Sequence, residues 1–103
     1  MQAAAPVVDR REQKKLEAGE RQRLSALRKP IETRIKRLEE QIAKQNSKKA
    51  QIDVQIADPA IYDPANKERL KTLLSDQAYC VKELAQLENE WLEKQDELEA
   101  IGA

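Results

Sequence analysis

The 103-residue chain has no phenylalanine and no histidine, a single cysteine (Cys80) and only three aromatic side chains. Without histidine it lacks the commonest general base and metal ligand. One cysteine can form neither an internal disulfide nor a multi-thiol metal site. The chain has only two glycines and four prolines, too few for the many turns that a β-sheet would need. With so few bulky side chains the chain cannot fill a globular core, which argues against an enzyme with a folded pocket.

Long apolar runs are missing too. No segment approaches the ~20 apolar residues of a membrane span, and the apolar run from Ala3 to Val8 is short and broken by Pro6, unlike a signal peptide. No GxxxxGK[ST] loop for binding nucleotide phosphates is present. We therefore expect a cytoplasmic, non-catalytic chain that binds no cofactor or metal and does not associate with a membrane.

Charged residues, 37% of the total, surround two heptad series of mostly apolar residues. The first series is Ile31, Ile35, Leu38, Ile42, Gln45, Lys49, Ile52 and Ile56. The second is Leu70, Leu73, Gln77, Cys80, Leu84, Leu87, Trp91, Lys94, Leu98 and Ile101. If the chain folds back near residue 63, the apolar positions of the two series meet, and so do the polar interruptions, Lys49 with Gln77 and Gln45 with Cys80. This pattern predicts an all-α fold, an antiparallel two-stranded coiled coil in which a polar layer helps to fix the register.

The hairpin should be preceded by a charged extension. The expected organisation is a disordered lead-in over residues 1–8, a charged helical linker over 9–29 and the coiled-coil hairpin over 30–101. Pro30 removes one helical hydrogen bond and clashes with the preceding turn, so either the long helix kinks there or a new helix starts there. The heptad frame continues across Pro30 to Leu24, which favours the kink.

Two Asp-Pro pairs mark the turn between the helices, around residues 57–63. Asp58 should be extended because it precedes a proline, and it should end the first helix. Asp63 is expected to cap the second helix, with the following proline at its first position. Ile61 and Tyr62 are expected to fold back over the open end of the seam between the helices.

The zero net charge conceals an asymmetry between the two halves. Residues 9–56 carry 14 Lys/Arg against 8 Asp/Glu, a net charge of +6, and residues 57–103 carry 5 against 11, a net charge of −6. A basic helix therefore lies beside an acidic one. The charges could serve only the attraction between the helices, or the basic helix could also present a face to nucleic acid.

Basic residues of the first helix are the only candidate binding site. The candidate nucleic-acid-binding residues are Arg28, Lys29, Arg34, Lys36, Arg37, Lys44 and Lys48. Lys29, Lys36, Arg37 and Lys44 occupy outward heptad positions, whereas Arg34 and Lys48 lie where they could also pair with Glu90 and Asp76. Further basic residues continue the series toward the N-terminus: Arg10, Arg11, Lys14, Lys15, Arg21 and Arg23. Spacings of three, four and seven residues on a helix can follow a phosphate backbone, and no aromatic or groove-reading motif accompanies them, so we expect binding without base specificity.

The order of these features resembles the C-terminal coiled-coil domain of the soluble ABC-F ATPases, of Uup or YheS type. The resemblance covers about residues 9–101. It depends on the segments Leu27-Arg-Lys-Pro-Ile-Glu and Lys36-Arg-Leu-Glu-Glu-Gln-Ile, on the turn from Asp58 to Tyr62, and on a tryptophan late in the second helix, Trp91. Pro30 departs from the helix-forming residue that the pattern would have there.

The resemblance implies a function that spacing alone does not. It implies that the chain is the nucleic-acid-contacting arm of a longer ATPase that acts on the ribosome or on DNA, with ATP and Mg²⁺ bound only in ATPase domains absent from this sequence. The partner would be DNA or ribosomal or transfer RNA, with the ribosome as a further candidate, and the hairpin would be monomeric. The alternative is a structural spacer or a protein-interaction coiled coil that binds no nucleic acid.

Overall fold

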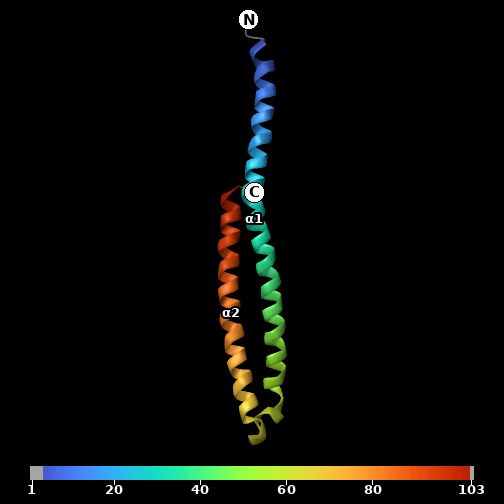
Figure 1. Cartoon of the computed structure of the whole chain (residues 1–103), viewed down its shortest axis with the longest axis vertical. Coiled ribbons are helices and arrows are strands. Elements are labelled where there is room, and N and C mark those ends of the chain that lie inside the picture. The colour runs from blue at the N-terminus through green and yellow to red at the C-terminus, as the bar shows by residue number, and fades with distance from the viewer. Residues whose placement is uncertain (1–3, 103) are drawn as a thin grey trace.

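The computed structural model describes residues 4–102, with side chains described from Asp9 onward. Two long helices, α1 (Ala4–Ala57) and α2 (Lys67–Ala100), run antiparallel and are joined by two short 3₁₀ turns, η1 (Pro59–Tyr62) and η2 (Pro64–Asn66). The molecule is a rod of 95 × 15 × 15 Å. Helix α1 is longer than α2, and its N-terminal part projects beyond the hairpin as a single helix (Figure 1). The predicted all-helical hairpin is thus confirmed.

Helix α1 passes through Pro30 without a break. The possibility that a new helix starts at this proline is therefore wrong, and the linker and the first hairpin helix form one element. The helix also includes Ala4–Val8, which we had expected to be disordered. Residues 1–3 of that expected lead-in lie outside the described residues.

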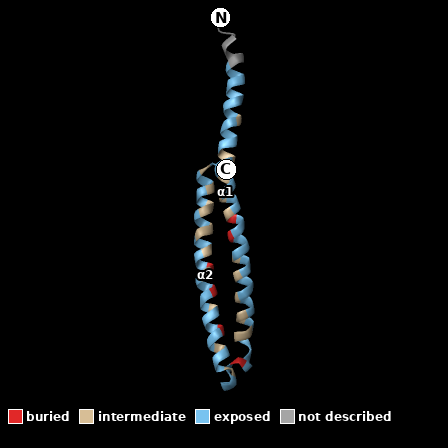
Figure 2. Ribbon diagram, viewed as in Figure 1, coloured by how far each residue is buried: buried red, intermediate tan, exposed pale blue. Residues whose placement is uncertain are grey.

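The buried residues follow the predicted seam. Five of them occupy heptad positions: Ile35, Leu38, Leu73, Cys80 and Leu84. They lie where the two ribbons face each other (Figure 2). Most other seam residues are only half-buried, because two helices cannot enclose a seam on all sides. Leu38, with an exposed fraction of 0%, is the most deeply buried.

The turn matches the prediction at its start. Asp58 is extended (φ −72°, ψ 122°), and its carboxylate accepts a hydrogen bond of 3.0 Å from the backbone N–H of Ala60. Ile61 folds back and is buried, as expected. Tyr62 does not cover the seam, because its ring is exposed and its hydroxyl donates a 3.0 Å hydrogen bond to the carbonyl of Ile56 near the end of α1.

The second helix starts later than predicted. Asp63 is extended and precedes a proline, but its side chain makes no capping hydrogen bond, and the 3₁₀ turn η2 follows before α2 begins at Lys67. Asn66 stabilises this arrangement by donating a 2.8 Å hydrogen bond from Nδ2 to the carbonyl of Ala60. At the other end, Gly102 has φ +79°, the left-handed conformation expected of a glycine that stops a helix.

Candidate nucleic-acid interface

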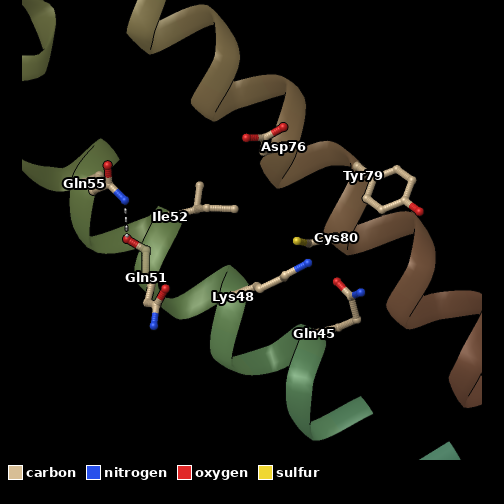
Figure 3. A pocket seen from close by; sticks show the side chains of 8 residues that line it. All are labelled: Gln45, Lys48, Gln51, Ile52, Gln55, Asp76, Tyr79 and Cys80. Carbon is tan, nitrogen blue, oxygen red and sulfur yellow. Dashed lines mark hydrogen bonds between the residues drawn. The ribbon is translucent and has the colours of Figure 1, made fainter. Parts of the chain in front are cut away.

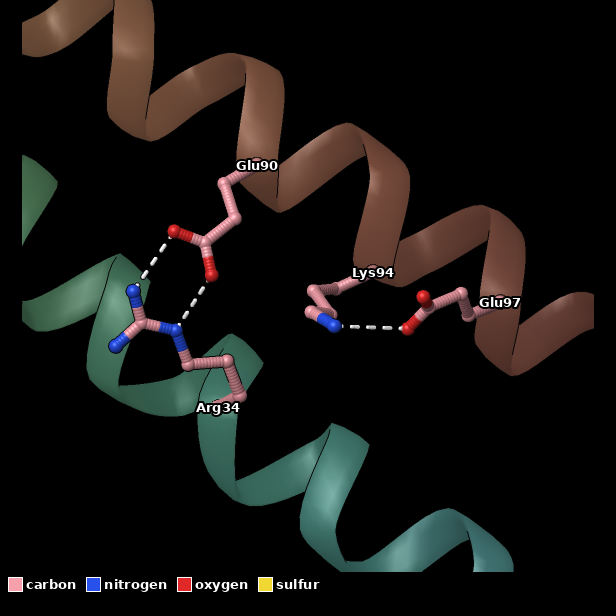
Figure 4. Close-up of polar contacts among 4 residues, drawn as sticks. All are labelled: Arg34, Glu90, Lys94 and Glu97. Carbon is pink, nitrogen blue, oxygen red and sulfur yellow. Dashed lines mark hydrogen bonds and ion pairs between the residues drawn. The ribbon is translucent and has the colours of Figure 1, made fainter.

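Arg34 is committed to α2. Its guanidinium donates two hydrogen bonds to the Glu90 carboxylate, 2.6 Å from Nε and 2.7 Å from Nη2 (Figure 4). This is the pair that the charge pattern predicted across the two helices. A bidentate pair of this kind leaves the guanidinium little capacity to bind a phosphate, so Arg34 is a poor candidate for the interface.

Lys48 and Asp76 do not form the second expected pair. In the described part of the chain no ion pair joins them, although both line one hollow between the helices together with Gln45, Tyr79 and Cys80. Figure 3 shows the Lys48 side chain extending across this hollow toward Gln45 and Cys80. Lys48 therefore lies over the junction of α1 and α2, away from the outward side of α1.

Arg28 is also partly engaged. Its side chain is 28% exposed, and its Nε lies 3.9 Å from the Glu32 carboxylate one turn away. Near the N-terminus Arg23 is held more firmly, by hydrogen bonds of 2.6 and 3.0 Å to Glu20. These local pairs partly neutralise two of the basic residues that the sequence placed in the series.

Four of the seven candidate residues remain on the outer side of α1. These residues, which we name the basic stripe, are Lys29, Lys36, Arg37 and Lys44. All four are exposed, and among residues 9–102 no acidic group lies within ion-pair distance of any of them. At 1.5 Å per residue the stripe is about 22 Å long. Glu40 interrupts it, lining a shallow hollow with Arg37 and Lys44.

A polar layer crosses the seam where the sequence predicted one, but with a different partner. Gln77 donates a 2.7 Å hydrogen bond to Asp53, which also accepts one of 2.9 Å from Lys49. The Lys49 ammonium and the Gln77 amide hold the pKa of the Asp53 carboxyl below its usual value. The expected contact of Lys49 with Gln77 is thus bridged by Asp53, a residue outside the heptad series. In the neighbouring layer the Gln45 side-chain oxygen is buried and has no hydrogen-bond partner.

Trp91 adds a contact that the sequence did not predict. Its indole N–H donates a 3.3 Å hydrogen bond to the carboxylate of Glu39, and Glu88 lines the same hollow. This donor offsets part of the repulsion between the two carboxylates. A tryptophan on the seam is expected to find a hydrogen-bond acceptor for its N–H, but the sequence did not identify which acceptor.

Among the described residues, no three His, Cys, Asp or Glu side chains gather as a metal site would require. Cys80 is buried in the seam, as predicted. None of the helices in the described range is both long and apolar enough to cross a membrane.

Comparison with protein-family models, with curated proteins and with solved structures finds no match to this chain.

The Arg34–Glu90 pair should make stability depend on pH. The Arg34 guanidinium holds the pKa of the Glu90 carboxyl below its usual value of 4.5. The pair therefore stabilises the hairpin fully above that value, and this stabilisation is lost as the pH falls through the lower pKa of the folded state. We expect Glu90→Gln to lower the melting temperature at about pH 7 and to have little effect at about pH 2.

Thermal melting followed by circular dichroism at both pH values would check this. Glu99→Gln is the matched control, because Glu99 is exposed and forms no ion pair among the described residues. A Glu90→Gln effect of equal size at both pH values would contradict a contribution from the charged pair.

Proposed function

We propose that the chain is a non-catalytic coiled-coil arm that binds nucleic acid through the phosphate backbone. The observation that carries this proposal is the basic stripe, four exposed cations on the outer side of α1 without an acidic partner within ion-pair distance. Arg34, on the side of α1 that faces α2, is by contrast neutralised by Glu90. If charge served only the attraction between the helices, the outer side would not need a surplus of one sign.

The rod shape supports the same proposal. A helix some tens of ångströms long can place cations along a phosphate backbone, because duplex DNA carries one negative charge per about 1.7 Å of its axis. The stripe lacks side chains arranged to read base edges, so the proposed binding is independent of sequence. The partner is DNA or ribosomal or transfer RNA.

The resemblance to the C-terminal domain of ABC-F ATPases supplies a cellular setting within this proposal. In that setting the arm supports a translation-related or DNA-related role of an ATP-binding parent protein in the cytoplasm. The resemblance rests mainly on the Asp58–Tyr62 turn and on Trp91. The comparisons with known proteins neither support nor oppose it.

The double substitution Arg37→Glu and Lys44→Glu tests the stripe. Both residues are exposed on α1 and face away from the seam. Each cation that neutralises a phosphate adds about 0.9 to the slope of log affinity against log salt, so we expect the slope to fall by about 2. Fluorescence anisotropy with labelled duplex DNA and with structured RNA, at several salt concentrations, measures this.

Lys67→Glu and Lys82→Glu form the matched control. Both lysines are exposed on α2, and the control changes the net charge by the same amount. The proposal expects the control to retain most of the salt dependence of the wild type. Equal losses in both variants would mean that only net charge matters and would overturn the assignment to the stripe.

The alternative function is a spacer. The extended 95 Å rod favours it, because such a shape can separate two attached domains without binding anything itself. A chain that binds neither polymer at low salt would support the spacer.

A further inference from the structure

The two edges of the hairpin differ in chemistry. On the edge where Arg34 meets Glu90, acidic residues of α2 recur one heptad apart: Asp76, Glu83, Glu90 and Glu97. The opposite edge, which we name the apolar edge, carries Glu39, Asn46 and Asp53 of α1 beside small and apolar residues that recur at steps of three, four and seven. These small and apolar residues are Ala43 and Ala50 of α1 and Leu74, Ala78, Val81, Ala85 and Leu92 of α2.

The apolar edge is uncovered in the single chain. Leu74, Val81 and Leu92 are 46%, 50% and 55% exposed, although the solvent-facing side of a coiled-coil helix normally carries polar and charged residues. A hollow continues this edge and is lined by residues of both helices: Glu39, Ile42, Ala43, Asn46, Glu88, Trp91 and Leu92. An exposed apolar stripe of this kind is typical of a helix face that packs against another helix.

We propose that this edge binds a second copy of the same chain, giving a dimer of hairpins whose turns lie at the same end. The two-fold axis then runs parallel to the rod. It places α2 of one copy alongside α1 of the other, so each apolar stripe of α2 lies over the alanines of α1.

Shape complementarity at matching heights supports this choice of partner. Residues of the two helices at similar heights have similar sums of residue numbers. The hydrogen-bonded pairs Asp53–Gln77 and Glu39–Trp91 sum to 130, and Arg34–Glu90 and Gln55–Arg69 sum to 124. Leu74 and Ala50 also sum to 124. So do Val81 and Ala43. In the proposed dimer, Leu74 and Val81 of one copy therefore meet Ala50 and Ala43 of the other, so large side chains pack against small ones as close helix packing requires.

Charge complementarity points the same way. One heptad beyond Val81 the apolar edge is interrupted by Glu88, and one heptad before Ala43 on α1 lies Lys36. These two residues also sum to 124, so Glu88 of one copy lies at a similar height to Lys36 of the second copy and can pair with it. Lys36 is exposed and has no acidic group within ion-pair distance among the described residues, so it is available for this contact.

The opposite orientation does not satisfy Glu88. If the two turns lay at opposite ends, with the axis at the middle of the apolar edge, α2 would lie against α2. Glu88 would then meet Ala78 of the second copy, and a carboxylate facing an apolar residue in an interface loses solvation without gaining a partner. The sequence therefore favours the arrangement in which α1 meets α2.

Sedimentation velocity over a range of protein concentration tests the dimer. The wild type should dimerise, and Val81→Glu should weaken association by about 100-fold or more, since it places a carboxylate in the apolar stripe. Tyr79→Glu is the matched control, because Tyr79 is also exposed on α2 but lines a hollow on the opposite edge. Circular dichroism checks that both variants remain helical.

A charge exchange tests the orientation. Lys36→Glu and Glu88→Lys should each weaken the dimer by about tenfold, because each places like charges opposite one another, and the double variant should restore most of the affinity. A wild type that stays monomeric at about 100 μM, well above the concentrations at which specific helical dimers form, would overturn the proposal. So would a double variant that dimerises no better than the single ones.

The proposed dimer shares one residue, Lys36, with the basic stripe proposed to bind nucleic acid. Arg37 and Lys44 lie on the other side of α1 from the apolar edge, so reversing their charge should leave dimerisation unchanged. The two proposals can therefore fail separately.

Discussion

Replacing Leu38 with alanine is expected to lower the free energy of unfolding by about 2–5 kcal/mol, the usual cost of truncating a fully buried leucine. Leu38 is the one described residue with no exposed surface. The loss combines the apolar area removed from the seam with the cavity that the two helices cannot close completely. It is a large fraction of the stability of a domain of this size.

Urea unfolding followed by circular dichroism measures this loss. Leu16→Ala is the matched control, because Leu16 lies on the same helix, is 73% exposed and should change stability by less than about 0.5 kcal/mol. Similar losses in the two variants would mean that α1 is stabilised along its length without a localised seam.

Replacing Pro30 with alanine is expected to have the opposite sign and to raise the free energy of unfolding by up to about 3 kcal/mol. Pro30 lies inside α1 and is exposed, so its ring contributes little packing. Alanine restores the missing N–H and removes the clash with the carbonyl one turn earlier. The gain is an upper value, because Pro30 lies near the end of the hairpin, where helices fray.

Pro59→Ala provides a control with the opposite expected sign. Pro59 starts the 3₁₀ turn η1, where its fixed φ suits the conformation. Its replacement frees the unfolded chain and should lower stability by about 0.4–1 kcal/mol. A Pro30→Ala variant less stable than the wild type would contradict a continuous helix at that position.

The sequence predicted the hairpin because the two heptad series carry strong and matching information. Leu38, Leu73 and Leu84 are buried where the series placed them, and Cys80 is buried beside Gln45 at a polar interruption. Periodicity determines which side of a helix is apolar, and the short turn lets the apolar sides of the two helices face each other.

Local hydrogen bonds could not be predicted in the same way. Tyr62 has both an apolar ring and a hydroxyl, and the free carbonyl of Ile56 at the end of α1 decided its position. Similarly, Asp53 lies outside the seam series, but its carboxylate reaches the Gln77 amide across the helices. Such contacts depend on side-chain reach and conformation, which spacing does not encode.

The candidate site was only partly resolvable from sequence. Spacing separated the outward residues Arg37 and Lys44 from Arg34, whose pairing with Glu90 the charge pattern had suggested. The apolar edge was not predicted, because Leu74, Val81 and Leu92 lie beside the strongest apolar series and are not part of it. The recurrence of Leu74 and Val81 one heptad apart was the available signal.

Phosphate binding by the basic stripe is tested most directly by the salt dependence of nucleic-acid binding by the wild-type chain. Anisotropy titrations with labelled duplex DNA and structured RNA at ~50 and ~200 mM salt suffice. With four phosphate contacts, the affinity for duplex DNA should fall by about 10²-fold between these concentrations. Absence of binding at the lower salt concentration, or binding that salt does not weaken, would contradict phosphate binding by the basic stripe.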